Sequence, residues 1–323
     1  MTVHPISVAP MMKCTDRHDR NFLRTISKKV LLYTEMLTTQ AIVHARDPSK
    51  LLSFEESEHP LALQIAGSDP VQIRDAVLIA NSYKFDEINF NLGCPSKRVQ
   101  KNNFGACLMS DYQLVLKCLK SIVDTSKVPI SIKMRTGINN CTSYEFLKNF
   151  VNHISDSGCT KYIIHARNAL LGSLSPKNNL KIPPLKYDYV YRLKNNFPFF
   201  QIILNGGIRS LMEVDTHLNK VDGIMMGRGV YNNPYLLTEV DKKYYNVNCS
   251  RLDRFEIIDR YLPYVEKELE KGVNLHQISR HMLGLFKGIN GSKVWKKYLS
   301  ENILKDNTGI NILKDAKSNL LNI

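Results

Sequence analysis

Short apolar runs alternate with amphipathic stretches between about residue 6 and residue 240. Each run has the length of a buried strand, and each gap is long enough to hold a helix. The alternation favours parallel β/α units over hairpins. Eight strands are predicted, at 6–11, 30–36, 61–67, 87–93, 129–135, 161–167, 200–207 and 223–229.

Two of the intervening stretches carry clear helix signals. Asp69 and Pro70 suit an N-cap and a first helical turn, and apolar residues then recur at helical spacing. From Ser143 to Ser157 the apolar positions again follow a helical period, and Gly158 is a typical stop. Both stretches fit helices that connect parallel strands.

Eight alternating strands are the number that closes a (β/α)8 barrel. A doubly wound open sheet is the alternative. The barrel is favoured because polar or glycine residues stand at the ends of nearly all the runs, and in a barrel those ends meet on one face. The sequence therefore predicts an α/β protein, a (β/α)8 TIM barrel followed by a small all-α helical bundle.

The alternation stops near residue 240, and the rest of the chain reads as helices only. These helices are expected at 254–271, 275–288, 292–304 and 310–321. The predicted organisation is a catalytic barrel over 1–242 and an α-helical domain over 243–323. The segment 168–186 is longer than a routine βα loop, so it is expected to carry function.

Charge changes this picture more than overall composition does. The chain has a net charge of +14, and residues 94–110, 157–187 and 271–300 contain Lys and Arg without any acid. Base-composition bias would scatter lysines among acids. The three acid-free blocks instead favour a surface for a polyanion such as nucleic acid.

Cysteine usage and hydropathy indicate the compartment. The seven cysteines are odd in number and form no C-x-x-C pair, which argues against a disulfide framework and against a zinc site. No apolar run approaches the ~18 residues needed to span a bilayer. The first residues lack the pattern of a signal peptide. A cytoplasmic protein without membrane association or a metal is expected.

Cys94 is the most informative single residue, since it lies between Gly93 and Pro95 directly after a predicted strand. A free thiol is mostly protonated at neutral pH and can deliver a proton. No cysteine-protease pattern accompanies it, which weakens a nucleophilic role. A buried structural cysteine is the alternative, but the flanking residues favour a positioned acid.

Other strand ends suit a flat, phosphorylated cofactor. The segments 205–207 (NGG) and 227–229 (GRG) end the seventh and eighth strands, where barrels most often bind phosphate. Arg228 adds a planar, permanently charged donor. Tight turns and salt-bridged or hydrogen-bonded core residues are the plainer alternative. Three more strand ends carry a hydrogen-bonding group or a cation: Gln64, Lys133 and His165.

An ordered set of motifs extends these features over almost the whole chain. They include Ala9-Pro10-Met11, NLGCPS from Asn91, FGACLM from Phe104, IIHAR from Ile163, NGGI from Asn205 and RHMLGLF from Arg280. The set resembles the bacterial tRNA-dihydrouridine synthase family. The resemblance is strongest to its DusA branch, which modifies uridines 20 and 20a in the D-loop of tRNA.

The resemblance implies tightly bound FMN, with NADPH or NADH as the reductant. Hydride would pass from flavin N5 to C6 of a uridine in tRNA, and Cys94 would protonate C5. The isoalloxazine is expected against Met11, Met12, Lys13, Gln64, Lys133 and His165, and the ribityl phosphate against Asn205, Gly206, Gly207, Gly227 and Arg228. Asn91 and Arg167 are expected to read the uracil edge.

The target uridine must leave its stack to reach a barrel mouth. Recognition of folded RNA by shape and backbone then suits dispersed cations. The cations expected to contact tRNA are Lys97, Arg98, Lys177, Lys181, Lys293, Lys296 and Lys297. Trp295 is expected either to stack on RNA or to lie in a core. No stable protein partner is implied, and a monomer is expected.

Two other functions fit part of the pattern. A flavin barrel acting on a free pyrimidine, like dihydroorotate or dihydropyrimidine dehydrogenases, would explain the barrel and Cys94. It would leave the basic helical domain unexplained. A non-catalytic RNA-binding protein on the same fold would predict loss of the flavin positions, and these are all present.

Overall fold

The computed structural model describes residues 4–96, 100–172, 174–303 and 309–321. The chain forms two compact units, which we call the barrel unit (Met1–Met11 and Leu31–Gly227) and the helical unit (Met12–Val30 and Arg228–Ile323). This division differs from the ranges expected from the sequence, because residues 12–30 and 228–242 group with the C-terminal helices. The assignment of catalysis to 1–242 and of tRNA binding to 243–323 stays a prediction.

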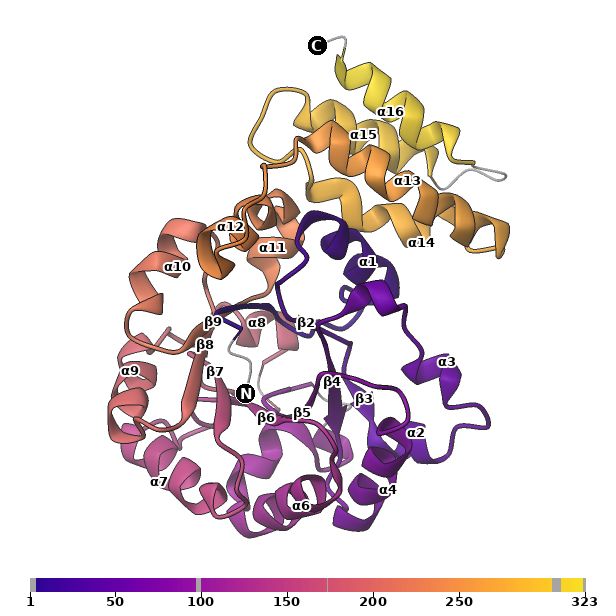
Figure 1. Ribbon diagram of the computed structural model, residues 1–323. Helices are drawn as coiled ribbons and strands as arrows, with labels where there is room; N and C mark the ends of the chain where they lie inside the picture. Colours follow the sequence, from indigo (N-terminus) through magenta and orange to yellow (C-terminus); the bar gives the residue numbers. More distant parts are fainter. Residues whose placement is uncertain (1–3, 97–99, 173, 304–308, 322–323) are drawn as a thin grey trace. The chain divides into compact units, whose positions relative to one another are not determined.

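The strands of the barrel unit pair in parallel around a common axis, in the order β1-β9-β8-β7-β6-β5-β4-β2 (Figure 1). A parallel bridge between Ser7 and Leu31 links the two ends of this order. The predicted TIM barrel is therefore confirmed. Its strands are β1 Ile6–Val8, β2 Leu32–Tyr33, β4 Leu61–Ala66, β5 Glu87–Leu92, β6 Ile130–Arg135, β7 Lys161–His165, β8 Gln201–Asn205 and β9 Gly223–Met226.

Several details of the strands differ from expectation. β1 and β2 are shorter than the predicted runs 6–11 and 30–36. A two-residue strand, β3 (Leu37–Thr38), pairs with β4 and was not predicted, because two residues are too few to show a period. The last predicted strand, 223–229, stops at Met226, since a helix begins at Arg228.

Helices surround the strands of the barrel unit in Figure 1: α2 Thr39–Val43, α3 Ser49–Leu52, α4 Pro70–Ala80, α6 Tyr112–Thr125, α7 Tyr144–Ser155, α9 Tyr187–Asn196 and α10 Leu211–Leu218. The predicted start of α4 is confirmed, because the Asp69 carboxylate accepts the backbone N–H groups of Val71 and Gln72. Ser143 caps α7 in the same way. Two 3-10 turns complete the unit, η1 Glu56–Glu58 and η2 Gly105–Ser110.

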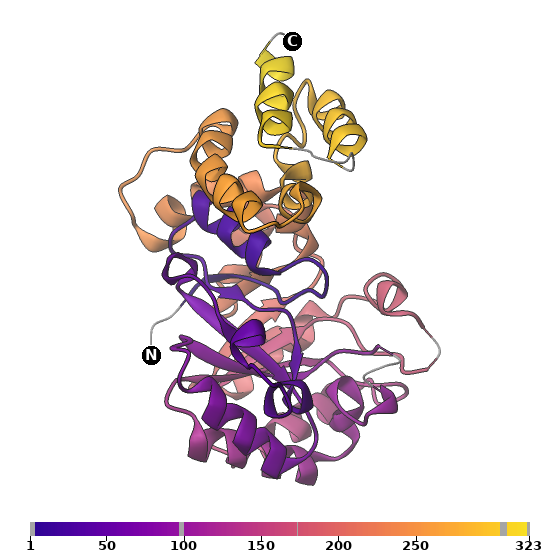
Figure 2. The same ribbon diagram turned by 90° about the vertical axis from the view of Figure 1, so that its right-hand side faces the viewer.

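The long segment 168–186 follows β7. It contains one short helix, α8 (Pro176–Asn179), and projects from the barrel unit in the side view of Figure 2. Asn179 is fully buried, and its side chain donates to the carbonyl oxygens of Leu170 and Leu174 at 3.0 and 3.2 Å. A single buried amide thus closes the described part of this loop on itself.

The helical unit contains α1 Arg17–Ile26, α11 Arg228–Asn232, η3 Pro234–Glu239, α12 Val240–Tyr245, α13 Arg254–Glu270, α14 Leu275–Ser279, η4 Arg280–Gly284, α15 Ser292–Asn302 and α16 Asn311–Leu321. The helix predicted over 275–288 divides into α14 and η4. Glycine is required at the end of η4, because a Cβ on Gly284 would lie 2.8 Å from the carbonyl oxygen of Asn232.

Trp295 lies in the core of the helical unit. It is fully buried, its indole N–H donates to the carbonyl oxygen of Met282 at 3.1 Å, and its ring packs 4.9 Å from that of Phe286. Of the two roles expected for Trp295, the structure selects the core. In the part of the chain that is described, no helix is both long and apolar enough to cross a bilayer.

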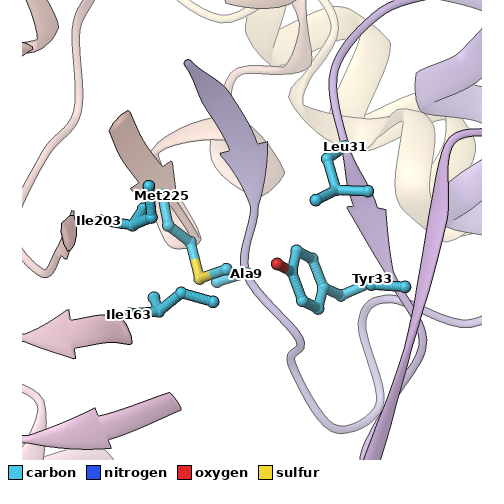
Figure 3. Close-up of a cluster of buried hydrophobic side chains, with 7 residues drawn as sticks. Ala9, Leu31, Tyr33, Ile163, Ile203 and Met225 are labelled. Atoms are coloured by element: carbon cyan, nitrogen blue, oxygen red, sulfur yellow. The ribbon is translucent and has the colours of Figure 1, made fainter. Parts of the chain in front are cut away.

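The interior of the barrel holds an apolar cluster and a group of polar side chains. Figure 3 shows Ile163, Ile203 and Met225 on one side of Ala9, with Leu31 and Tyr33 on the other. Ala62 completes this cluster, and Met11 packs against it. Buried polar side chains occupy other positions along β4, β5, β6 and β7. The candidate site lies among these polar side chains, at the carboxyl ends of the strands.

Candidate active site

The strand register brings polar side chains together at the carboxyl ends of five strands. Gln64 lies opposite Asn89, Asn91 opposite Lys133, Arg135 opposite His165, and His165 opposite Asn205. Side chains alternate along a strand, so residues two apart on one strand share the interior face. The inward positions therefore form a polar ring at the barrel mouth.

The loop that carries Cys94 is held from three directions. The Asn91 side-chain oxygen accepts the backbone N–H groups of Gly93 and Cys94 at 3.1 and 3.0 Å. Arg135 Nε donates to the Gly93 carbonyl oxygen at 3.1 Å, and the Ala106 N–H donates to the Cys94 carbonyl oxygen at 3.0 Å. Its half-buried thiol thus stands on a fixed backbone.

Other cysteines of the barrel unit have a different environment. Cys118 and Cys159 are buried, and each donates its thiol to a backbone carbonyl oxygen at 3.6 Å. Burial raises the pKa of each to about 12. Cys107 is half-buried, with its thiol bonded to the Phe104 carbonyl oxygen at 2.9 Å. These contacts are typical of structural cysteines.

The mouth holds cations that are not balanced by acids. Lys133 Nζ donates to the neutral Asn205 side-chain oxygen at 3.1 Å, and Arg135 donates to backbone carbonyl oxygens. Burial, followed by the charge on Arg135, lowers the pKa of Lys133 to about 7. Burial also lowers the pKa of Arg135 to about 10. Among the described residues, no carboxylate pairs with either cation, so the site favours an anionic ligand.

Arg135 was not predicted as a site residue. Its alternation with Lys133 placed both on one face, and that pattern was the available signal. The structure buries Arg135 to 4% exposure against the Cys94 loop. A thiolate at Cys94 would favour the charged forms of both cations. Lys133, Arg135 and Cys94 therefore share one electrostatic neighbourhood.

β8 ends in two closely packed glycines. Gly206 and Gly207 have φ angles of +113° and +83°, which only glycine adopts without strain. A Cβ on Gly207 would lie 2.5 Å from the Tyr187 hydroxyl, and one on Gly206 would lie 3.1 Å from the His165 ring. Gly227, at the end of β9, would place a Cβ 3.3 Å from the Met11 sulfur. Side chains of the protein already lie close to all three glycines, so the contact of this backbone with a phosphate stays a prediction.

The predicted cofactor residues divide between the two units. Met11, Gln64, Lys133, His165, Asn205, Gly206, Gly207 and Gly227 belong to the barrel unit. Met12, Lys13 and Arg228 belong to the helical unit. Met12 is 56% exposed, and Arg228 is exposed at the start of α11. Their contact with a flavin stays a prediction.

The two residues expected to read uracil are already engaged. Asn91 uses its oxygen for the Cys94 loop and donates one amide hydrogen to Gln64 at 2.9 Å. It keeps a second amide hydrogen, so it can act only as a donor. Arg167 is half-buried and donates to the Pro183 carbonyl oxygen, which ties it to the long segment after β7.

The predicted tRNA contacts are placed only in part. Lys97 and Arg98 lie outside the described residues. Lys177 and Lys181 are exposed, within or just after α8. Lys293, Lys296 and Lys297 are exposed along α15. The described residues contain no cluster of three His, Cys, Asp or Glu side chains suited to a metal ion.

Comparison with known proteins identifies the family. The family model described as Dihydrouridine synthase (Dus) matches residues 7–321. The tRNA-dihydrouridine(20/20a) synthase of Escherichia coli (strain K12) is 48% identical over 311 residues, which cover 96% of this chain and 90% of the relative. The Shewanella oneidensis protein of the same name is 46% identical over 310 residues, which cover 96% and 92%.

A structure of morphinone reductase in complex with tetrahydroNAD aligns with a TM-score of 0.49 at 10% identity, over 77% of this chain and 88% of that one. The Escherichia coli relative is 48% identical to this chain, and both this relative and the family model match nearly its full length. The chain belongs to the dihydrouridine synthase family, which confirms the resemblance and the predicted class of tRNA-modifying oxidoreductase.

Proposed function

We propose that this chain reduces uridines 20 and 20a in the D-loop of tRNA to 5,6-dihydrouridine, with FMN as the cofactor and NADPH as the reductant. The observation that carries the proposal is a half-buried thiol, Cys94, on a fixed loop beside two cations without acidic partners. Family membership gives the reaction class. We further propose that the protein acts in the cytoplasm as a monomer.

The donor set at the mouth fits a flavin. An excess of cations suits an anionic ring system and a phosphate. Glycines at the ends of β8 and β9 have no side chain of their own over the backbone N–H groups that would bind the phosphate. Lys133 would offset negative charge on the ring, and Asn205, Gly206 and Gly207 would hold the ribityl phosphate. When bound, the flavin supplies hydride to C6 of uracil.

The chain itself supplies the proton and the orientation. Cys94 is the proton donor to C5, and its loop is kept in place by Asn91 and Arg135. The remaining Asn91 amide hydrogen is available to a carbonyl oxygen of the uracil. Fixing the donor and the base in this way removes orientational freedom before the reaction, a main source of rate acceleration.

A cationic face of α15 is evidence for tRNA as the substrate. Lys293, Lys296 and Lys297 are exposed at i, i+3 and i+4 spacing, while Trp295 and Leu299 are fully buried on the opposite face. A helix with one buried face and one cationic face is built to present charge to a polyanion. A free pyrimidine would have no use for this face, which disfavours the dehydrogenase alternative.

The substrate can be tested with purified flavin-loaded protein, NADPH and unmodified tRNA transcripts. Transcripts with uridine at 20, at 20a or at neither position separate the two sites, and mass spectrometry of nuclease fragments locates the gain of two hydrogens. We expect conversion at both positions and none of free uridine. Conversion of free uridine, or of a transcript lacking both positions, would contradict the proposal.

Replacing Lys293, Lys296 and Lys297 together with alanine is expected to weaken tRNA binding. The slope of the logarithm of the tRNA-binding constant against the logarithm of the salt concentration should become shallower by up to about 3. The reason is that each lysine that neutralises a phosphate releases about one counterion. The rate of flavin reduction by NADPH should stay unchanged. Filter binding at several salt concentrations measures the effect.

A matched control removes the same charge elsewhere. Lys117, Lys120 and Lys127 are exposed on or just after α6, and their replacement with alanine also lowers the net charge by three. This triple variant should change affinity only slightly. Equal losses in the two variants would show that bulk charge, and not the α15 face, holds the tRNA.

A further inference from the structure

A continuous line of buried polar side chains leads away from the Cys94 loop through the barrel interior. Asn91 Nδ2 donates to Gln64 Oε1 at 2.9 Å, and Gln64 Nε2 donates to Asn89 Oδ1 at 2.6 Å. Asn89 Nδ2 donates to Ser131 Oγ at 2.7 Å, and Ser131 donates to Glu87 Oε1. All five side chains are at most 7% exposed. We call this line the amide relay.

The lower end of the amide relay is a buried ion pair. Lys161 Nζ lies 2.6 Å from Glu87 Oε2, and the Tyr33 hydroxyl donates to Glu87 Oε1 at 2.8 Å. An ionised carboxylate can only accept hydrogen bonds, so Ser131 must give it the hydroxyl proton. The oxygen of Ser131 is then left to accept from Asn89.

The upper end of the amide relay imposes the same direction. The backbone N–H groups of Gly93 and Cys94 can only donate, so Asn91 must turn its oxygen toward them. Its NH2 group then faces Gln64. The side-chain amide of a buried Asn or Gln can in principle be turned either way, but here both ends demand one arrangement and they agree.

We infer that Glu87 is a positioning residue for the reaction. Its carboxylate requires the same direction of donors that the backbone N–H groups of Gly93 and Cys94 require, and the relay meets the Cys94 N–H at the side chain of Asn91. The same direction leaves the second amide hydrogens of Gln64 and Asn91 free for the mouth. This role rests on the proposed function, because the relay acts on uridine reduction through the Cys94 loop and through the Gln64 and Asn91 amides that face the mouth.

Stability alone does not account for this arrangement. An apolar cluster fills another part of the interior, so apolar side chains can also pack inside this barrel. Apolar side chains of similar volume are often as stabilising as a buried ion pair, whereas a polar line is useful when one arrangement must be specified. What the amide relay specifies is the orientation of Gln64 and Asn91.

Ser131→Ala is the test that cuts the amide relay and keeps the Glu87–Lys161 pair. Tyr33→Phe is its matched control, because it removes a hydroxyl from the same carboxylate oxygen without interrupting the relay. Ser131→Thr keeps the hydroxyl and should restore the wild-type values. All proteins are studied in the flavin-loaded form.

Two measurements report on the Cys94 loop independently of catalysis. Iodoacetamide labelling of Cys94 can be followed by mass spectrometry against the exposed Cys141 in the same sample. Hydrogen exchange of the peptide that holds Gly93 and Cys94 reports on their N–H groups. In Ser131→Ala we expect both rates to rise about tenfold, the effect of one lost buried hydrogen bond. Tyr33→Phe should match the wild type.

Kinetics completes the test. In Ser131→Ala we expect kcat for uridine reduction to fall about tenfold with KM for tRNA unchanged, because the relay touches the acid and not the basic surfaces. Unchanged labelling and exchange, or equal changes in Tyr33→Phe, would overturn the positioning role. Should the wild type reduce no uridine, only the proposed function fails, since labelling and exchange still test the relay.

A second variant covers the case in which Ser131→Ala does not fold. Glu87→Gln combined with Lys161→Met keeps the volumes and removes both charges, so the amide at position 87 can face either way. The amide relay then keeps only the constraint at its upper end, so the Asn91 side chain is held less firmly and faster labelling of Cys94 is again expected. Wild-type labelling in this double variant would overturn the inference.

Discussion

Cys94→Ala is expected to lower the rate of uridine reduction by about 10²-fold or more, within the roughly 10²–10⁴-fold contributed by a positioned acid. Reduction of the bound flavin by NADPH should stay at the wild-type rate, because that step needs no proton from the thiol. Single-turnover experiments that follow flavin absorbance with and without tRNA separate the two steps. In this variant the flavin should therefore be reduced by NADPH at the normal rate, and uridine should be reduced much more slowly.

Two further cysteine variants make this result specific. Cys94→Ser keeps the size and a hydroxyl that is a far weaker acid than a thiol, so it should remain close to the alanine variant. Cys107→Ala removes a half-buried thiol that is bonded to a backbone carbonyl oxygen, and it should retain the wild-type rate. If Cys94→Ala reduces uridine within a few-fold of wild type, another group is the acid.

The barrel could be predicted because its signals are local. Each strand is a short apolar run, and Asp69 and Ser143 cap the following helices within three residues along the chain. What escaped prediction depends on distant contacts. The backbone of Asn232 lies so close to Gly284 that only glycine fits there, and the sequence near residue 284 does not indicate that neighbour.

The residues of the candidate site also divide into those with a local sequence signal and those identified only by distant contacts. Cys94, Lys133 and His165 were identified from their place at strand ends, a property of the sequence alone. Glu87 begins a strand, and its importance appears only when β6 and β7 bring Ser131 and Lys161 to it. Alternation along a strand gives the face of a residue, whereas its partner across the barrel depends on register.

The polar side chains in the barrel interior thus form two parts with different chemistry. Among the described residues, no carboxylate pairs with Lys133 or Arg135 at the mouth, which suits an anionic ligand, and the Glu87 carboxylate below them is paired with Lys161. Because Glu87 lies below the mouth, it pairs with Lys161 and not with Lys133. A change that removes the charge of Lys133 should therefore affect ligand binding and the stability of the empty protein in opposite directions.

Lys133→Met is expected to weaken FMN binding below about pH 7 and to stabilise the empty protein there. Burial, then the charge on Arg135, lowers the pKa of Lys133 from its ordinary value to about 7. At any pH between about 7 and the ordinary pKa of lysine, the unfolded chain binds more protons at Lys133 than the folded chain does. The stability of the empty protein therefore rises with pH across that window, and the unfavourable burial of the ammonium is complete below it.

Binding of an anion has the opposite dependence. An anionic ligand beside Lys133 favours the ammonium, so FMN binding takes up a proton and should weaken as pH rises above about 7. At about one pH unit below the pKa, the wild type should bind FMN about 10–100-fold more tightly than Lys133→Met, the contribution of a charge-assisted hydrogen bond. The ratio should shrink as pH rises.

Fluorescence titration of the flavin-free proteins over a pH series measures both affinities, and thermal unfolding of the same samples measures stability. Taking the ratio of wild type to variant at each pH cancels the titration of FMN itself. Lys127→Met, which removes an exposed charge just before β6, should follow the wild type throughout. If Lys133→Met keeps the wild-type decline of affinity with pH, the titrating cation at the mouth is a different group, and Lys133 does not bind the anion.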